Sequence, residues 1–365
     1  MNLVRRSVLK HPSGLEVKTP LLIPSFSSKG FVFPLKQKSE KAGHTFFQTK
    51  IKLPKEDNTT SGKISEVAKL IKNVSDTLTD SMLVSAYDIY HKHIPIPYEN
   101  RTPDIIFLDS GGYEVGDAFD YSEIIRSDIK PNQWNLEKHT EVLETWPDYV
   151  PAVFVSYDCG FRGKPIAEQI KLAKRSLFAF KGKQLCTFLI KPIRKEEKTF
   201  NKTFTEVCNN ITKLKSFDII GIAEKDLGNS VVLVMRNIAK FRLVLDANKI
   251  NIPLHIFGSL DPLTTWLYYI SGAELFDSLT WLRYGYSKGQ AIYYRNHGII
   301  SFGINKKEDE IKAKTIEDNL HYLSDLQLEM AGFAADGNYD IIRFNSILIK
   351  NKAEGLHRYL KRRFK

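Results

Sequence analysis

Residues 252–282 read IPLHIFGSLDPLTTWLYYISGAELFDSLTWL, and the order of apolar and polar residues in this stretch decides the fold class. The apolar runs over 252–257 and 275–282 each predict a strand that is buried on both faces. Asp261-Pro262 is typical of a helix N-cap followed by a proline in the first turn, so residues 263–270 are predicted to form a helix. A strand, a helix and a second strand in succession form the unit from which parallel sheets are built.

The same unit recurs along the rest of the chain. Six further apolar runs rich in β-branched residues bring the predicted strands to eight: Pro20–Phe26, Met82–Ile89, Asp104–Leu108, Pro151–Tyr157, Leu185–Ile190 and Phe217–Ala223. Helical spacing of apolar residues predicts helices over 64–71, 166–177, 201–214 and 231–245. Strands and helices that alternate in this way predict an α/β fold, specifically a (β/α)8 TIM barrel.

Two segments depart from the regular alternation. Gly30–Asp80 contains a long insertion after the first strand, and residues 291–365 form an extension, helical and basic, after a barrel of residues 1–290. Within the extension we expect a hairpin around Ile292–Ile304 and a helix near Ile316–Met330.

Charge points to a polyanionic partner. The 365-residue chain carries a net charge of +11, which favours nucleic acids through Coulomb attraction and counterion release. Arg358, Lys361, Arg362 and Arg363 are the predicted nucleic-acid contacts at the basic C-terminus, although a solvated basic end explains the same pattern. No apolar stretch approaches the ~18 residues of a membrane span, and the first residues lack a signal-peptide pattern, so we expect a cytoplasmic protein without a membrane partner.

Neither a metal site nor a cofactor is expected. Cys159, Cys186 and Cys208 are too few and too scattered for a disulfide framework, and they form no C-x-x-C pair. His91 and His93 have no further ligand nearby in the sequence, so we interpret them as part of a polar loop.

The carboxyl ends of barrel strands are where such enzymes carry their chemistry. The polar residues at these positions are Asp109-Ser110, Asp158-Cys159, Lys191, Glu224-Lys225-Asp226, Ser259, Asp277 and Arg283. Any one of the acids alone is more often a helix cap or a solvated loop residue. Acids on different strands that face one mouth instead predict a two-carboxylate catalytic site with a third acid for recognition.

Five segments of the chain resemble those of tRNA-guanine transglycosylases. Leu108-Asp109-Ser110-Gly111-Gly112-Tyr113 resembles the family's D-S-G-G-[FY] motif, and 275–283 resembles the segment that carries its nucleophilic aspartate. Three further segments are similar to the family's first strand, the glycine turn before its seventh helix and the segment after the nucleophile: Thr19–Pro24, Ile256–Pro262 and Gly289–Ala291. The resemblance therefore covers residues 19 to 291, most of the chain.

The resemblance implies a role for each matching residue. Asp277 would attack the anomeric carbon and form a covalent glycosyl-enzyme, while Asp109 would act as general acid and base. Tyr113 would stack on the base, and Asp158 would accept hydrogen bonds from the N1–H and amino group of guanine. The other base-binding residues that it implies are Ser110, Gly112, Lys191, Gly221 and Gly258. Arg283 would contact phosphate or orient the nucleophile, with a structural ion pair as the alternative.

Three departures from the family pattern bear on the substrate. Lys191 stands where the family usually carries a glutamine that contacts the base. The zinc cluster is missing, and Thr315–Leu320 occupies the place of its histidine, so the extension is expected to fold without metal on Leu320, Leu323, Leu326 and Met330. No appended RNA-binding domain is present in the sequence. These departures favour the DNA-directed branch of the superfamily, which inserts 7-cyano-7-deazaguanine into DNA.

The sequence thus leads to the hypothesis of a DNA-guanine transglycosylase that uses a free 7-deazaguanine base. A duplex base must be flipped out to reach a barrel mouth, and an ATPase helper protein is a candidate partner for that step. A divergent, zinc-free tRNA-guanine transglycosylase is the first alternative. A non-catalytic nucleic-acid-binding partner subunit is the second, and the presence of both Asp109 and Asp277 argues against it.

Overall fold

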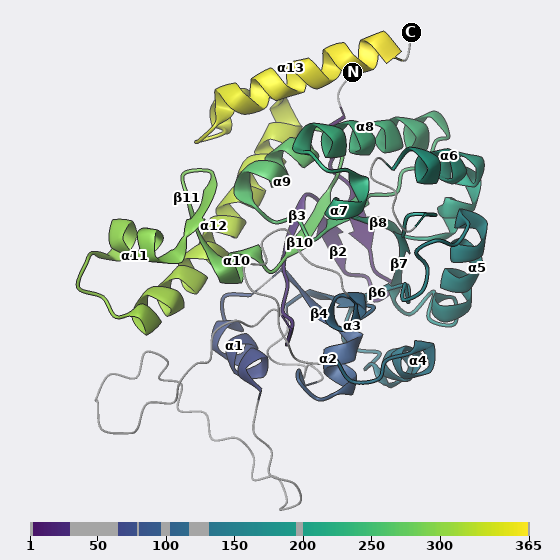
Figure 1. Ribbon diagram of the computed structural model, residues 1–365, viewed down its shortest axis with the longest axis horizontal. Coiled ribbons are helices and arrows are strands. Elements are labelled where there is room, and N and C mark those ends of the chain that lie inside the picture. Colours follow the sequence, from purple (N-terminus) through teal and green to yellow (C-terminus); the bar gives the residue numbers. More distant parts are fainter. Residues whose placement is uncertain are drawn as a thin grey trace, which may run out of the picture.

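The computed structural model describes residues 3–29, 65–78, 80–95, 103–116, 131–194 and 200–363, and an eight-stranded parallel sheet curled into a barrel forms its centre (Figure 1). In chain order the strands are β3 (Leu21–Pro24), β4 (Ser81–Ser85), β5 (Ile105–Asp109), β6 (Ala152–Val155), β7 (Leu185–Ile190), β8 (Ile219–Ala223), β9 (Leu254–Phe257) and β10 (Leu275–Ser278). From β4 to β10 each strand pairs with the next, and β10 also pairs with β3. The N–H of Phe26 donates to the carbonyl of Leu83 at 2.8 Å and joins β3 to β4, so the predicted (β/α)8 barrel is confirmed.

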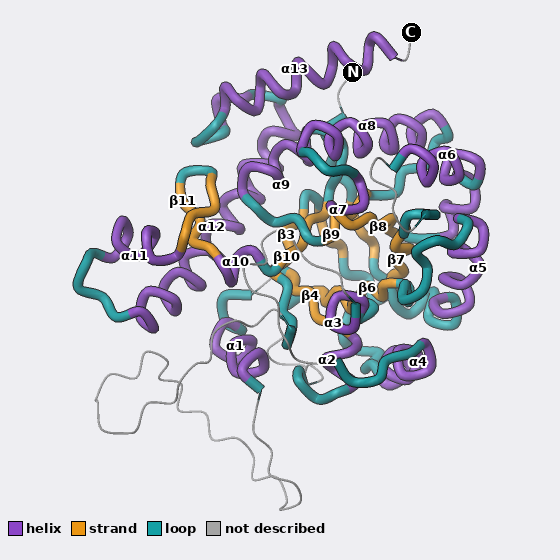
Figure 2. Tube along the Cα trace, viewed as in Figure 1, coloured by secondary structure: helices purple, strands orange, loops and turns teal. Residues whose placement is uncertain are grey.

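Helices follow the strands and surround the barrel (Figure 2). Their bounds are α1 (Glu66–Val74), α2 (Ala86–Tyr90), α3 (Gly112–Val115), α4 (Leu136–Thr145), α5 (Ile166–Leu177), α6 (Asn201–Asn209), the 3-10 helix η1 (Ile211–Ser216), α7 (Glu224–Leu227), α8 (Val231–Ala247) and α9 (Pro262–Tyr269). The Asp261 carboxylate accepts the N–H groups of Leu263 and Thr264, which confirms the predicted N-cap of α9. Most of the predicted insertion Gly30–Asp80 lies outside the described residues, and α1 is its described part.

Each barrel strand contributes to two separate cores. In β5, Ile106 and Leu108 pack outward against the helices, whereas Phe107 packs inside the barrel. Because both faces are apolar, the strands appear in the sequence as continuous runs. At the carboxyl end the inward positions become polar, as at Ser25, Ser85, Asp109, Lys191 and Asp277.

The opposite end of the barrel is covered by a hairpin that the sequence did not predict. β1 (Val8–Lys10) and β2 (Glu16–Lys18) pair antiparallel, and their central residues Leu9 and Val17 join the inner core. The barrel interior is therefore closed at its amino end and accessible from the carboxyl end.

Two predicted strands are too long at their carboxyl ends. The run 82–89 leaves the sheet at Ser85, whose hydroxyl caps α2 by accepting the N–H of Asp88. The run 275–282 leaves the sheet at Ser278 and continues as the helical turn α10 (Thr280–Arg283). Both helical turns are apolar because they pack inside the protein, so their composition did not distinguish them from the strands.

The extension begins with a hairpin that lies earlier than predicted. β11 (Tyr284–Ser287) pairs with β12 (Gln290–Tyr293) across Lys288 and Gly289, which both have the positive φ that tight hairpin turns require. The predicted hairpin around Ile292–Ile304 is wrong, because α11 (Tyr294–Phe302) occupies most of that range. The helix predicted near Ile316–Met330 is present as the longer α12 (Glu308–Asp336), followed by the 3-10 helix η2 (Tyr339–Ile341) and α13 (Ser346–Arg363).

The extension shares the core of the barrel. Leu320, Leu323, Leu326 and Met330 of α12 are all buried, as predicted, in the cluster that also contains the outward residues of the strands. The N–H of Leu22 in β3 donates to the Gln327 side chain at 2.8 Å. Gln327 also donates to the carboxylate of Asp80, just before β4, at 3.1 Å, so α12 covers the sheet where β3 and β4 meet.

Asn319 of α12 ties the extension to the end of the barrel. Its side chain is fully buried, donates to the carbonyls of Trp281 (2.6 Å) and Tyr284 (2.7 Å) and accepts the N–H of Tyr286 (2.7 Å). This hydrogen-bonded amide lies within the segment Thr315–Leu320.

Replacing Asn319 with alanine is expected to destabilise the fold by about 3 kcal/mol, because three buried backbone groups lose their partner at about 1–3 kcal/mol each, with partial relaxation. Urea denaturation followed by circular dichroism measures the change. His321→Ala, an exposed site two residues along the same helix, is the matched control and should change stability by less than about 0.5 kcal/mol. Equal stability of the two variants would contradict the anchoring role of Asn319.

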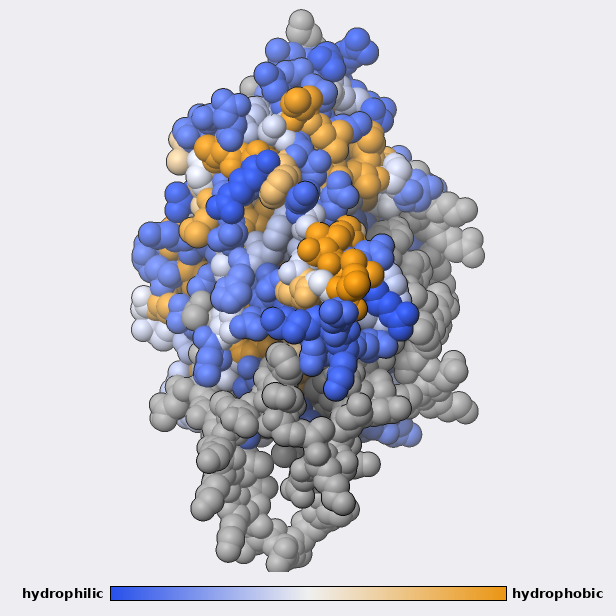
Figure 3. Space-filling view, turned by 90° about the vertical axis from the view of Figure 1, so that its left-hand side faces the viewer, coloured by the Kyte–Doolittle hydropathy of each residue, from blue (hydrophilic) through white to orange (hydrophobic). Residues whose placement is uncertain are grey.

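The surface over the extension carries exposed apolar side chains. Figure 3 faces the side of the molecule that bears α11 and α12 and shows hydrophobic patches separated by hydrophilic residues. Ile299 and Ile300 of α11 are 52% and 67% exposed, and Ile347 at the start of α13 is 75% exposed. Within the described ranges, no helix is long and apolar enough to cross a membrane.

Candidate active site

An open cavity of about 140 Å³ lies at the carboxyl end of the barrel. All eight strands, or the loops that follow them, contribute to its lining. Asp109, Asp158 and Asp277 all line it, so the structure brings the three predicted acids to one place. Neither a scan against models of known protein families nor a search of curated proteins found a match for this chain.

Asp277 is held by contacts to both of its carboxylate oxygens. The Ser25 hydroxyl donates to Oδ2 at 2.8 Å, and Nε2 of His255 lies 3.0 Å from Oδ1. The Asp277 residue is 6% exposed, at the inner wall of the cavity. These contacts fix the plane of the carboxylate and leave it accessible only from the cavity.

Asp109 has a very different electrostatic environment. Burial in the cavity wall, together with the nearby carboxylates of Asp158, Glu114 and Asp277, raises the pKa of its carboxyl to about 8. Lys191 opposes this shift only in part. Asp109 is therefore a protonated acid at neutral pH and can donate a proton to a bound molecule.

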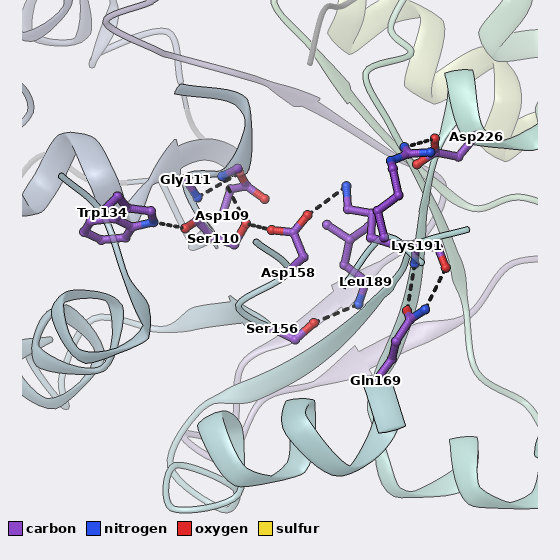
Figure 4. Close-up of polar contacts among 12 residues, drawn as sticks. Asp109, Ser110, Gly111, Trp134, Ser156, Asp158, Gln169, Leu189, Lys191 and Asp226 are labelled. Atoms are coloured by element: carbon purple, nitrogen blue, oxygen red, sulfur yellow. Dashed lines mark hydrogen bonds and ion pairs between the residues drawn. The ribbon is translucent and has the colours of Figure 1, made fainter. Parts of the chain in front are cut away.

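Asp158 remains ionised beside it. Burial would raise the pKa of this carboxyl, but the Lys191 ammonium at 2.7 Å from Oδ2 and a hydrogen bond from Ser110 to Oδ1 lower it below its usual value. Figure 4 shows Asp158 between Ser110 and Lys191. Each carboxylate oxygen has a second lone pair, so Asp158 can still accept two donors from a bound molecule.

The two glycines of the Asp109–Tyr113 segment allow the chain to pass close to its neighbours. A Cβ at Gly112 would lie 2.8 Å from Oδ1 of Asp158, and Gly111 has a φ of +84°. This agrees with the tight turn that the sequence predicts. The turn places Ser110 beneath Asp158, where its hydroxyl also accepts the N–H of Gly112 at 3.2 Å.

Tyr113 and Arg283 lie together at the mouth. The Arg283 guanidinium donates to the Tyr113 hydroxyl at 3.0 Å, and the Lys29 ammonium lies 4.7 Å from the centre of the tyrosine ring. Arg283 is only 3% exposed and does not itself line the cavity, so it is buried behind Tyr113 rather than placed on the surface. Of its predicted roles, this position fits the orientation of active-site groups better than contact with an exposed phosphate.

Gly258 lines the cavity as predicted, but Gly221 does not. A Cβ at Gly221 would lie 2.5 Å from the Phe257 ring, so this glycine makes room for that ring beneath the cavity floor. Side chains alternate along a strand, so position 221 faces the barrel interior, as Ala223 does. It lies two residues before the end of β8, which places it below the cavity instead of in its wall.

The sequence interpretation missed two residues that line the cavity, Phe257 and Glu114. Lys225, which the sequence placed at a strand end without a role, also lines it, and burial with the neighbouring Lys191 lowers its pKa to about 8. Burial and the nearby Asp88 raise the pKa of Glu114, which accepts a hydrogen bond from Ser27 at 2.5 Å. Phe257 is the apolar last residue of β9 and Glu114 lies within α3, so a search for polar residues at strand ends found neither.

The predicted nucleic-acid contacts lie away from the cavity. Arg358, Lys361, Arg362 and Arg363 are exposed on α13, which packs against α9 and η2, and none of them lines the cavity (Figure 1). Their part in nucleic-acid binding stays a prediction.

The remaining sequence predictions concern metals and cysteines. His91 and His93 lie in the turn that follows α2, in agreement with their interpretation as part of a loop, and the ring of His91 also packs 4.5 Å from that of Tyr87. Across the described segments, no group of three or more His, Cys, Asp or Glu side chains is arranged to hold a metal ion. Cys159, Cys186 and Cys208 are free thiols, in agreement with the expectation of no disulfide framework.

Proposed function

We propose that this protein is a DNA-guanine transglycosylase, which exchanges guanine in DNA for 7-cyano-7-deazaguanine by double displacement. The observation that carries the proposal is the set of three carboxyl groups in one cavity, of which Asp109 is protonated, Asp158 is ionised and Asp277 is held by two neighbours. The resemblance of residues 19 to 291 to tRNA-guanine transglycosylases adds the reaction class.

The division of charge suits the two chemical steps. Asp277 attacks the anomeric carbon as the bond to guanine breaks, and the protonated Asp109 gives its proton to the departing base. The resulting Asp109 carboxylate then deprotonates the incoming base, which displaces Asp277. One acid thus serves both steps, and an environment that raises its pKa to about 8 suits alternation near neutral pH.

Base recognition is assigned to the wall that carries Asp158. Its free lone pairs accept the N1–H and amino group of guanine, a pair of donors that adenine lacks. Lys191 and Lys225 add positive charge on the same wall. That charge suits an acceptor atom such as a carbonyl oxygen or a nitrile nitrogen. It opposes a cationic aminomethyl group, which supports the cyano form of the incoming base.

DNA is the proposed polymer because of the way in which the extension packs. The extension packs on the barrel through apolar residues and Asn319, in place of the zinc site through which the resembling tRNA enzymes position tRNA. The net charge of +11 supports binding to either nucleic acid. A tRNA substrate remains the alternative, and an ATPase helper remains a candidate partner for opening duplex DNA.

Base exchange on matched substrates tests the proposal. Purified protein is incubated with 7-cyano-7-deazaguanine and with single-stranded DNA, duplex DNA or tRNA, with and without cell extract, and the digested nucleosides are identified by mass spectrometry. The deazapurine deoxynucleoside is the expected product. A ribonucleoside product from tRNA alone would replace DNA by tRNA as the substrate, and no product from any polymer would overturn the proposed activity.

A further inference from the structure

A buried histidine lies directly beneath the proposed nucleophile. His255 of β9 is fully buried inside the barrel, where its ring stacks on Phe257 (centres 3.9 Å apart) and meets the edge of Phe107 (5.6 Å). The inner core around it is otherwise apolar. Within the described part of the chain neither ring nitrogen makes an aligned hydrogen bond, and the polar atom that the ring faces is Oδ1 of Asp277, which lies 3.0 Å from Nε2 and is likewise without a hydrogen-bond partner.

The contact makes the two oxygens of Asp277 unequal. Oδ1 is sealed from solvent and faces His255, whereas Oδ2 faces the Ser25 hydroxyl. A serine hydroxyl rotates freely and can yield its position, but the imidazole is fixed between two aromatic rings. Oδ2 is therefore the oxygen available for bond formation, and Oδ1 stays with the histidine.

We propose that His255 is a positioning residue that acts mainly in the second displacement, by stabilising the Asp277 carboxylate as it leaves. The inference rests on the proposed function. It assigns the Nε2–H as the donor to Oδ1 during the reaction, across a 3.0 Å contact that is present before chemistry begins.

The electron balance shows why the second step depends on this contact. In the first step a lone pair of Oδ2 forms the bond to the anomeric carbon, the bond to N9 of guanine breaks, and the base takes the proton of Asp109. Oδ1 becomes the carbonyl oxygen of the glycosyl ester. In the second step the incoming base, deprotonated by Asp109, forms the new bond. The bond to Oδ2 then breaks, and negative charge returns to the carboxylate, where a donor on Oδ1 stabilises it.

The same hydrogen bond has opposite effects on the two steps. It lowers the charge on the attacking carboxylate, which offsets the benefit of holding it in place, so the first step changes little without it. In the second step both effects act in the same direction, because the leaving carboxylate is stabilised and its ester is held in line. Removing the donor should therefore slow the second step selectively and allow the covalent intermediate to accumulate.

His255→Phe and His255→Gln test the inference. Phenylalanine keeps the stacking and volume but removes the donor, whereas the glutamine amide nitrogen is as many bonds from Cβ as Nε2 is. A guanine-containing oligonucleotide is added first, and release of guanine and formation of the adduct are followed on a denaturing gel. 7-Cyano-7-deazaguanine is then added, and decay of the adduct is timed.

For His255→Phe we expect guanine release within about tenfold of the wild type and adduct decay slower by about 10²-fold. His255→Gln should restore decay to within about tenfold. Decay in the phenylalanine variant equal to the wild type, or equal slowing of both steps, would overturn the inference while the proposed function stood. Thermal melting checks folding, and His255→Asn, whose amide is one bond too short, replaces the phenylalanine variant if that one does not fold. If the wild type forms neither adduct nor product, the proposed function fails and the inference fails with it.

Discussion

The Asp277→Asn variant should lose base exchange by roughly 10³-fold or more while binding nucleic acid within a few-fold of the wild type. The side-chain amide keeps the size of the carboxylate and can still face Ser25 and His255, so the cavity keeps its shape. What it lacks is the anionic oxygen that forms the glycosyl bond. Affinity is expected to survive because phosphate contacts dominate it.

Mass spectrometry of digested nucleosides measures the exchange, and a filter-binding titration at fixed salt measures the affinity. Asp148→Asn is the control, because Asp148 is 75% exposed at the amino end of the barrel, beside Lys183. Retained turnover in the Asp277 variant, with contamination by the wild type excluded, would show that another group is the nucleophile.

The rate of guanine release is expected to depend on pH in the wild type and to lose that dependence in Asp109→Asn. The acid form is needed for guanine release, so the rate of that step should fall about tenfold per pH unit above about 8, the pKa to which burial and nearby carboxylates raise this group. Asp109→Asn should lose about 10²–10⁴-fold in guanine release at pH 7 and show no falling limb. Release of labelled guanine from an oligonucleotide between pH 6 and about 10 measures both.

The same substitution is expected to stabilise the folded protein. The ordinary pKa of this carboxyl is 3.8, so between pH 3.8 and about 8 the unfolded chain is ionised while the folded protein keeps the proton. The stability that the raised pKa contributes is complete below pH 3.8 and lost as the pH rises towards 8, which means that Asp109 costs the fold most under alkaline conditions. The Tm of Asp109→Asn should therefore exceed that of the wild type at pH 8. Asp148→Asn, at a 75% exposed acid at the amino end of the barrel, is the control. A lower Tm for the Asp109 variant would contradict the raised pKa.

The barrel was predictable because its strands are buried on both faces, and such strands appear as apolar runs that end at polar residues. That rule also located Asp109 and Asp158, since each follows a run, whereas Asp277 lies within its run and was assigned through the family resemblance. It failed where the chain leaves the sheet but stays buried, as at α2 and α10, since an apolar helical turn and an apolar strand end have the same composition.

His255 illustrates a different limit. Its place inside the barrel follows from period-two spacing with Phe257, but its contact with Asp277 depends on how β9 aligns with β10, where Phe257 pairs with Asp277. Register between neighbouring strands is not encoded in one run alone. The same limit applies to Gly221, whose neighbour is a ring from the adjacent strand.

The pairing of β3 with β10 has a consequence for how the protein is made. The first barrel strand begins at residue 21 and can pair with β10 only after the ribosome has synthesised the residues from 275 onward. The contacts that close the barrel are therefore among the longest in sequence separation. Ser25 and Asp277 lie on the two sides of this closure, which means that the nucleophile acquires its serine partner only when the cylinder shuts. A nascent chain that has not completed β10 presents unpaired strand edges, which chaperones bind and other chains can join. Closure of the barrel is therefore also the step that brings Ser25 to Asp277, and a chain that ends before β10 lacks the complete cavity proposed as the active site.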